Sequence, residues 1–246
     1  MKADPADQRR LLDLAEVDAE LARLAHRRRT LPEDGEHATA EKAVQDAKDK
    51  LVGIETSAGD LDRDIRRIER DVEGVRARTT RDQEMLASAG VGAKQANDLQ
   101  HELETLARRQ GVLEDEQLEI MEQREAVGID LDHARGELTK AEETLTDVAT
   151  RRDSALADIA ASEAGRQRAR TETVAGIGAA DLLAVYETRL SQGRAGAALL
   201  RERRCGACRL ELDRTFISQL RAAAPDDVVH CEECGAILVR TSESGL

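Results

Sequence analysis

The four cysteines of the chain form two Cys-x-x-Cys pairs, Cys205 with Cys208 and Cys231 with Cys234, and 22 residues separate the pairs. A two-residue spacer lets a tight turn bring both thiolates to one tetrahedral ion, and two such turns complete a four-cysteine site. The spacing therefore predicts one structural zinc ion with these four cysteines as its ligands. Four protein ligands leave no open coordination position, which argues against a hydrolytic zinc.

Other uses of the same cysteines stay open at this point. A redox dithiol normally accompanies a βαβ pattern, which the sequence lacks, and four thiolates can also hold an iron–sulfur centre. His230 could replace a ligand, but it lies in a β-prone run. Glycines at 206 and 235 suit the sharp turns of a metal knuckle, and Arg204 and Arg209 could offset the charge of four thiolates.

The composition favours long helices over a large core. Among 246 residues there are one Tyr, one Phe and no Trp, while 35% are charged and the net charge is −13. Aromatic side chains normally supply much of a compact core, whereas this mixture suits helices that bury a narrow stripe. Disorder is the competing interpretation. The polar N-terminus and the absence of a run of about 20 apolar residues predict a cytoplasmic protein without a membrane partner. In that compartment four cysteines indicate metal or redox chemistry rather than a disulfide framework.

Two runs of apolar residues repeat in alternating steps of three and four, which is typical of a coiled coil. The second run begins at Leu99 and ends at Ile159, and polar residues that fill its gaps help to fix the pairing register. The first run comprises Val44, Ala47, Leu51, Ile54, Ala58, Leu61, Ile65, Ile68, Val72 and Val75. The polar fillers of the second run are Gln110, Gln117, Arg124 and Arg152.

The two runs are separated by a glycine-containing segment near residues 87–95, which permits a tight reversal. The arms on either side, roughly 6–86 and 95–172, are nearly equal in length, so they predict an antiparallel hairpin; a parallel dimer of extended chains is the alternative. Pro32 predicts a break or kink near residues 32–35. The fold class is therefore mainly α: a long antiparallel coiled-coil hairpin over 1–175, followed by a small C-terminal zinc ribbon with a short helix over 176–246.

Within the C-terminal part the elements are short. Residues 181–186 predict an amphipathic helix, and residues 215–224 predict a second helix that Pro225 ends. Two β-prone runs, 228–230 and 237–239, flank the second cysteine pair. This part contains few apolar residues, which implies that zinc supplies much of its stability.

This order of elements resembles the bacterial zinc-ribbon family with a coiled-coil hairpin. The resemblance rests on Cys205-Gly206-Ala207-Cys208, on Cys231-Glu232-Glu233-Cys234-Gly235-Ala236-Ile237-Leu238 and on the Leu-x-x-Glu-Leu stretch within residues 98–104. It implies a two-helix hairpin that ends in a zinc ribbon, and a nucleic-acid-binding or regulatory adaptor. Some relatives are linked to flagellar regulation through messenger RNA and an alternative sigma factor. Ala236 departs from the family, where a basic or aromatic residue often stands.

The leading functional prediction is a non-enzymatic adaptor that presents its hairpin to protein partners, with no small-molecule substrate. Nothing resembling a nucleophile–base pair or a phosphate loop stands out, so enzyme activity would need a partner to complete the site. The alternative is direct binding of RNA or DNA by an arginine cluster on the ribbon. Its residues are Arg201, Arg203, Arg204, Arg209 and Arg214.

Against nucleic-acid binding, residues 193–246 carry equal numbers of acidic and basic side chains, and only Tyr186 and Phe216 could stack on bases. A third prediction, an RNA-polymerase accessory factor, rests on architectural analogy alone. Such factors use acidic hairpin tips, whereas residues 90–95 contain no carboxylate.

Overall fold

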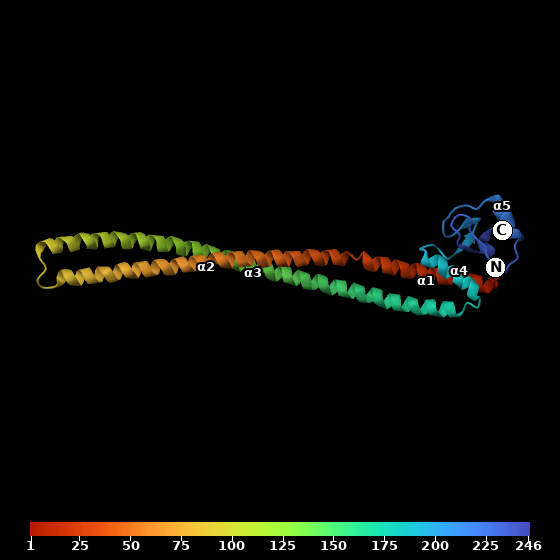
Figure 1. Ribbon diagram of the computed structural model, residues 1–246, viewed down its shortest axis with the longest axis horizontal. Helices are drawn as coiled ribbons and strands as arrows, with labels where there is room; N and C mark the ends of the chain where they lie inside the picture. Colours follow the sequence, from red (N-terminus) through yellow and green to blue (C-terminus); the bar gives the residue numbers. More distant parts are fainter. The chain divides into compact units, whose positions relative to one another are not determined.

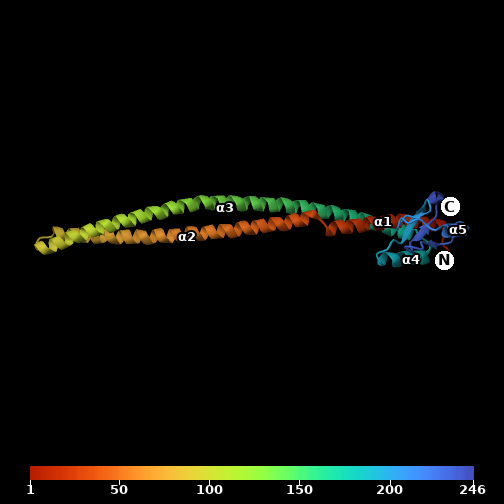
Figure 2. The ribbon, with the colours of Figure 1, turned by 90° about the horizontal axis from the view of Figure 1, so that it is seen from above.

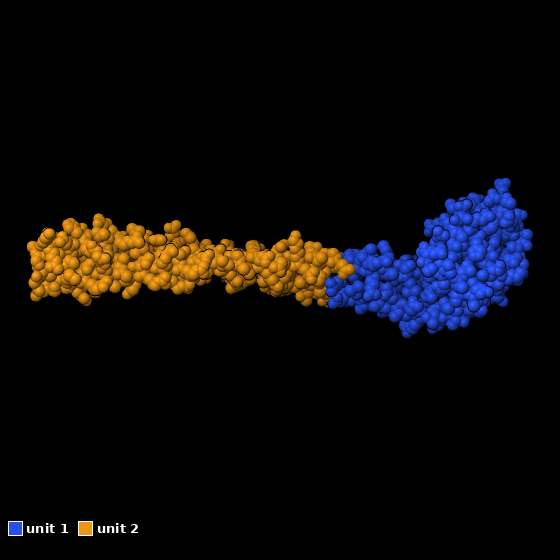
Figure 3. Space-filling view, in the orientation of Figure 1, with its two compact units in different colours: residues 1–32, 151–246 blue, residues 33–150 orange.

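The computed structural model describes residues 1–246 and separates into two compact units, coloured in Figure 3. Unit 1 comprises residues 1–32 and 151–246, and unit 2 comprises residues 33–150. The charged arms form helices and are not disordered. The elements in chain order are α1 (Pro5–Arg29), α2 (Pro32–Ala87), α3 (Ala93–Ala175), α4 (Ala180–Ser191), β1 (Ala197–Arg201), β2 (Arg204–Cys205), α5 (Arg214–Ala222), β3 (Val229–His230), β4 (Ile237–Val239) and the 3-10 helix η1 (Ser242–Ser244).

Unit 2 is an antiparallel pair of helices, made by α2 and the first part of α3 (Figure 1 and Figure 2). Ion pairs between the two helices show the direction of the pairing. Lys50 Nζ lies 2.7 Å from Glu137 Oε2, and Arg76 Nη2 lies 2.7 Å from Glu114 Oε1. Because a later residue of α2 meets an earlier residue of α3, the chain folds back on itself. The predicted antiparallel hairpin is therefore confirmed, and the parallel dimer is not needed to cover the seams.

Heptad spacing accounts for the packing of unit 2. Every predicted seam position between residues 44 and 148, the polar fillers included, is at least half-buried. Ile68, Val72 and Leu113 form the best-buried cluster. Arg124, a polar filler, donates to Asp62 Oδ1 at 2.7 Å, so it fixes the register of the two helices as polar seam residues do.

No helix of the protein combines the length and the apolar character needed to cross a membrane.

The helical path is interrupted between α1 and α2. Thr30 caps the C-terminal end of α1, where its N–H donates to the carbonyl oxygens of His26 and Arg27, and the buried Leu31 follows. Pro32 takes the first position of α2, where a missing N–H costs no hydrogen bond. Gly35 lies inside α2, so the proline rather than the glycine sets the interruption.

A buried polar network joins α1, α3 and α4 within unit 1. Asp18 of α1 is only 7% exposed and accepts from Arg170 Nε of α3 at 2.6 Å. The Tyr186 hydroxyl of α4 donates to Asp18 Oδ2 at 2.8 Å, and Arg170 Nη2 reaches Glu187 Oε1 at 2.6 Å. Burial raises the pKa of Tyr186, and its hydrogen bond to Asp18 adds to this, so the hydroxyl stays a neutral donor.

The ribbon contains a four-stranded sheet in the order β2-β1-β4-β3. The two predicted β-prone runs form β3 and β4, which pair antiparallel, and the predicted helix near 215–224 forms α5. β1 and β2 were not predicted; they form an antiparallel hairpin, and β1 also pairs parallel with β4.

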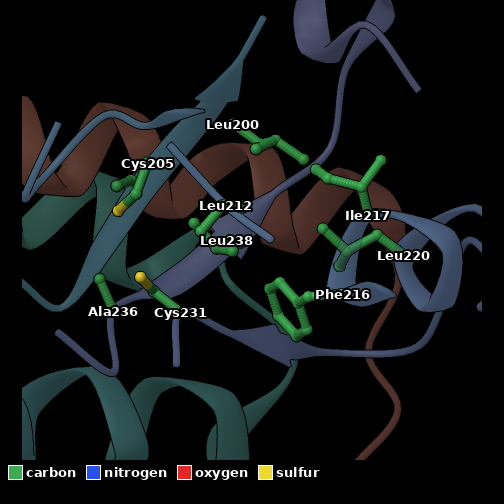
Figure 4. Close-up of a cluster of buried hydrophobic side chains, with 10 residues drawn as sticks. Leu200, Cys205, Leu212, Phe216, Ile217, Leu220, Cys231, Ala236 and Leu238 are labelled. Carbon is green, nitrogen blue, oxygen red and sulfur yellow. The ribbon is translucent and has the colours of Figure 1, made fainter. Parts of the chain in front are cut away.

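The two faces of this sheet carry two separate cores. Ala198, Leu200 and Leu238 point to the face that α5 covers, in a cluster that includes Cys205 and Cys231 (Figure 4). Residues that alternate with them along the strands pack instead with α1 and α4, as period-two side-chain alternation requires. The second core therefore fastens the two helices to the ribbon; its strand residues are Ala197, Ile237 and Val239.

Arg240 and the N-terminal residues tie together the loop after α5. Ala3 N–H donates to Asp226 O at 2.8 Å, and Val228 N–H donates to Met1 O at 3.1 Å. The Arg240 guanidinium satisfies carbonyl groups that α5 leaves unpaired at its C-terminal end. It donates to the carbonyl oxygens of Leu220, Ala223, Ala224, Pro225 and Asp227.

Candidate metal centre

The two cysteine pairs sit on two turns with the same backbone hydrogen bonds. In the first turn, Arg209 N–H donates to Cys205 O at 2.8 Å and Cys205 N–H donates to Leu210 O at 3.1 Å. The second turn repeats the pattern four and five residues after Cys231, at 2.7 Å and 2.9 Å. Two equivalent knuckles therefore aim their cysteine side chains into one space. The backbone thus has the two tight turns that the cysteine spacing predicts.

The sulfur positions fit one tetrahedral zinc ion. All four Sγ atoms lie within 4.8 Å of one another. Cys205 Sγ is 3.7 Å from Cys234 Sγ, and Cys208 Sγ is 3.9 Å from Cys231 Sγ. Zinc–sulfur bonds of about 2.3 Å place tetrahedral thiolates about 3.8 Å apart. The prediction of one structural zinc ion is confirmed by this clustering, and no position around such an ion is left for substrate.

The pKa values of the cysteine thiols also favour a bound cation at this site. Burial raises the pKa of Cys205 to about 12, and burial raises the pKa of Cys234 as well. Burial acts in the same direction on Cys231, but backbone N–H groups of Cys234 and Glu233 and neighbouring thiols leave its pKa below the usual value. Protein groups alone therefore do not favour four thiolates, and a bound divalent ion would supply the missing stabilisation.

Figure 4 shows how the centre is attached to the ribbon core, with the sulfur atoms of Cys205 and Cys231 at one end of the cluster and the side chains of α5 at the other. Cys205 is fully buried and Cys231 is 2% exposed. Gly206 permits the close approach of the first knuckle to β1, because a Cβ there would lie 2.7 Å from Leu199 O. His230 is a residue of β3 whose ring contacts Gly235 O at 3.3 Å.

Arg189 of α4 is a contributor to the centre that the sequence analysis missed. Its guanidinium donates to the carbonyl oxygen of Cys234 and, through Nε, to Ala195 O at 3.3 Å. It also lies against Gly235, where a Cβ would be 2.6 Å from Arg189 Nη1. The positive charge beside the second knuckle thus comes from α4, 45 residues away in the sequence. The only local sign was a basic residue in the last turn of that helix.

The two knuckles differ in the residue that follows the second cysteine. Gly235 has a φ of 72°, and Arg209, at the equivalent position, has a φ of 63°. Glycine adopts this left-handed conformation without steric cost, whereas other residues lose roughly 1–2 kcal/mol there. Arg209 is therefore a strained residue in the first knuckle.

Arg209→Gly is expected to stabilise the ribbon by about 0.5–1 kcal/mol, because the relief of strain exceeds the added freedom of the unfolded chain. Thermal unfolding of the zinc-loaded protein, followed at the ribbon, measures the change. Arg209→Asn is the matched control, since asparagine tolerates the left-handed region but lacks the charge. Destabilisation by both variants would show instead that the Arg209 charge supports the thiolates.

The five arginines predicted to contact nucleic acid are all exposed. Arg201, Arg203 and Arg204 lie on the β1–β2 hairpin, Arg209 follows the first knuckle, and Arg214 begins α5. Two of them are paired with acids: Arg201 Nε is 3.6 Å from Glu243 Oε2, and Arg204 Nη2 is 3.7 Å from Glu211 Oε2. Both aromatic side chains are buried, Tyr186 in one ribbon core and Phe216 in the other.

Comparison with known proteins agrees with this architecture. Residues 14–194 match the model of the CT398-like coiled coil hairpin domain, and residues 204–238 match the C4-type zinc ribbon domain. An uncharacterized protein of Mycobacterium tuberculosis is 40% identical over 98% of both chains.

Two solved structures are also similar. One from Mycobacterium smegmatis is 41% identical, with a TM-score of 0.87 over 98% of this chain and 100% of that one. CT398 from Chlamydia trachomatis is 19% identical and shares the fold, with a TM-score of 0.66 over 95% and 97% of the two chains. With its hairpin match over most of the length and its cysteine cluster in the ribbon, the chain belongs to the CT398-like coiled-coil hairpin family with a C4-type zinc ribbon.

Proposed function

We propose that this protein is a non-enzymatic adaptor whose hairpin binds a partner protein and whose ribbon is held by zinc on Cys205, Cys208, Cys231 and Cys234. The observation that carries the proposal is a set of apolar side chains exposed on the outer face of α3. Leu118 is 59% exposed and Ile129 is 59% exposed, although each lies inside a long helix with a buried seam elsewhere.

Leu118, Met121 and Ile129 share one face of α3, because their positions fall within about 80° around a helix of 3.6 residues per turn. Glu122 and Glu125 lie on the same face and are exposed. These five residues are called the acidic–apolar face. Exposed Leu, Met and Ile gain about 1.5–3 kcal/mol each when fully buried by a partner, and the carboxylates favour positive charge. The partner surface that fits is a basic amphipathic helix.

A comparison of variants tests this function. The tagged full-length protein is crosslinked and purified from its native organism, and the Leu118→Glu/Ile129→Glu variant is treated in the same way. Both changes are at exposed positions, so the hairpin is expected to fold normally, and the main crosslinked partner is expected to be lost.

Val112→Glu is the matched control, because Val112 is 57% exposed on the same helix but lies about 120° away from Leu118. It should keep the partner. Equal recovery of every partner by the wild type and the double variant would contradict the proposal.

Direct binding of nucleic acid is a second candidate, and the exposed Arg203, Arg209 and Arg214 favour it because no acidic side chain pairs with them. A salt-sensitive mobility shift with RNA or DNA supports it if the shift is lost in the Arg203→Glu/Arg209→Glu variant. Arg221→Glu, an exposed arginine on α5 outside this set, is the control. No shift at low salt would exclude this candidate.

A further inference from the structure

A groove of about 600 Å³ lies entirely within unit 1, beside the first zinc knuckle. Its lining is dominated by small apolar residues, so a ligand can approach the backbone closely. Leu12, Ala15, Ala19 and Ala22 of α1 form one wall. The rest of the lining comes from α4, from the segment before β1, from β1 and from Gly206 and Ala207 of the first knuckle.

The floor of the groove is a strand edge, as the ladder between β1 and β4 shows. Ala197 lies opposite Ile237 in this parallel ladder, and Ile237 N–H donates to Gly196 O at 3.0 Å. In a parallel ladder, alternate residues turn their N–H and C=O groups to opposite edges. Ala198 therefore faces β4, whereas the backbone groups of Ala197 face the other way, toward the groove.

On that side the neighbouring strand is too short to complete the pairing. β2 contains only two residues, and beyond it Gly206 N–H donates to Leu199 O at 2.9 Å. The ladder between β1 and β2 begins only at Leu200, and outside the ladders the N–H and C=O of Ala197 and the N–H of Leu199 make no hydrogen bond. An unpaired edge of this kind is a template for another extended chain.

We propose that this groove binds an extended apolar segment of a partner protein, which adds as a short strand to β1 beside Ala197 and rests its side chains on α1. This recognition by strand addition takes its affinity from main-chain hydrogen bonds and its specificity from the side-chain wall. The groove shares no residue with the acidic–apolar face of α3, so this proposal does not depend on the one made for that face.

The unpaired edge of β1 favours an extended segment over a helix, because a helix bonds its own N–H and C=O groups internally and has none to offer a strand. The α1 wall from Leu12 to Ala22 is about 15 Å long, which four or five extended residues span.

The rim adds a charge preference. Glu16 and Arg194 both line the groove and are exposed, and neither has an ion-pair partner in the protein. A segment that carries a basic residue toward Glu16 and an acidic residue toward Arg194 would satisfy both.

The test uses a displayed library of random seven-residue peptides, selected against the full-length zinc-loaded protein and then synthesised. Peptides enriched on the wild type are expected to slow hydrogen exchange of the Ala197 and Leu199 amides by at least about tenfold, as measured residue by residue with NMR. Ala19→Phe, which places a ring in the groove, should weaken binding at least about tenfold. Ala25→Phe is the matched control, an exposed alanine of the same helix outside the groove, and should bind normally.

Three results would overturn the proposal. The first is that selection gives no peptide, or only peptides that the Ala19→Phe protein also binds. The second is binding without slower exchange at Ala197 and Leu199, and the third is a bound peptide that is helical. Leu118→Glu/Ile129→Glu should leave peptide binding unchanged, so failure here is distinguishable from failure of the hairpin proposal.

Discussion

Cys205→Ser is expected to unfold the ribbon while the hairpin of unit 2 keeps its helical structure. Cys205 is fully buried and belongs both to the sulfur cluster and to the ribbon core. Structural zinc sites of this class contribute on the order of 10 kcal/mol to folding, which exceeds what the small ribbon core can supply. Unit 2 has its own seam and its own ion pairs, so it should not depend on the metal.

Circular dichroism and hydrogen exchange measure the two parts of this result. The helical signal should fall only slightly, whereas amides of β1, β4 and α5 should lose their protection. Treatment of the wild type with a strong chelator should give the same pattern, and added zinc should restore the wild type but not the variant. Unchanged protection of the ribbon after verified removal of metal would contradict the role given to zinc.

Asp18→Ala is expected to destabilise unit 1 by about 2–4 kcal/mol. The substitution removes the acceptor of Tyr186 and one of the two carboxylates that Arg170 contacts. Breaking a buried ion pair costs about 3–5 kcal/mol; the lower range applies because Arg170 keeps Glu187 and is 20% exposed. The effect should reach the metal centre, since α4 carries both Tyr186 and Arg189.

Thermal unfolding and the rate of zinc loss to a chelator test this prediction together. Tyr186→Phe is the matched control: it removes one hydrogen bond and keeps the ring, so it should cost only about 1 kcal/mol. Asp18→Ala should also release zinc several-fold faster than Tyr186→Phe. Equal stability of the two variants would show that Arg170 does not depend on Asp18.

Local sequence patterns predicted much of this architecture because they report on local geometry. Heptad spacing predicted the buried seams of α2 and α3, since a residue's place on a helix follows from its position in the repeat. Cysteine spacing predicted the metal centre for a similar reason: each knuckle is built within six residues, from Cys205 to Leu210 and from Cys231 to Ala236.

Long-range contacts could not be predicted in this way. Arg189 donates to the carbonyl oxygen of Cys234, and Arg170 donates to Asp18, which lies 152 residues earlier in the sequence. In the sequence alone, both arginines look like ordinary charged residues of a solvated helix. β1 was missed because its run, Ala197–Arg201, is short and rich in alanine, a residue depleted in strands. Its parallel pairing with β4 depends on contacts that no local pattern contains.

X-ray absorption at the zinc edge of the purified full-length protein, with the metal content measured on the same sample, decides whether the four cysteines hold one zinc ion. One zinc per chain is expected, surrounded by four sulfur atoms at about 2.3 Å. Iron in place of zinc, or a nitrogen or oxygen ligand in the first shell of the metal, would contradict a closed four-cysteine zinc centre.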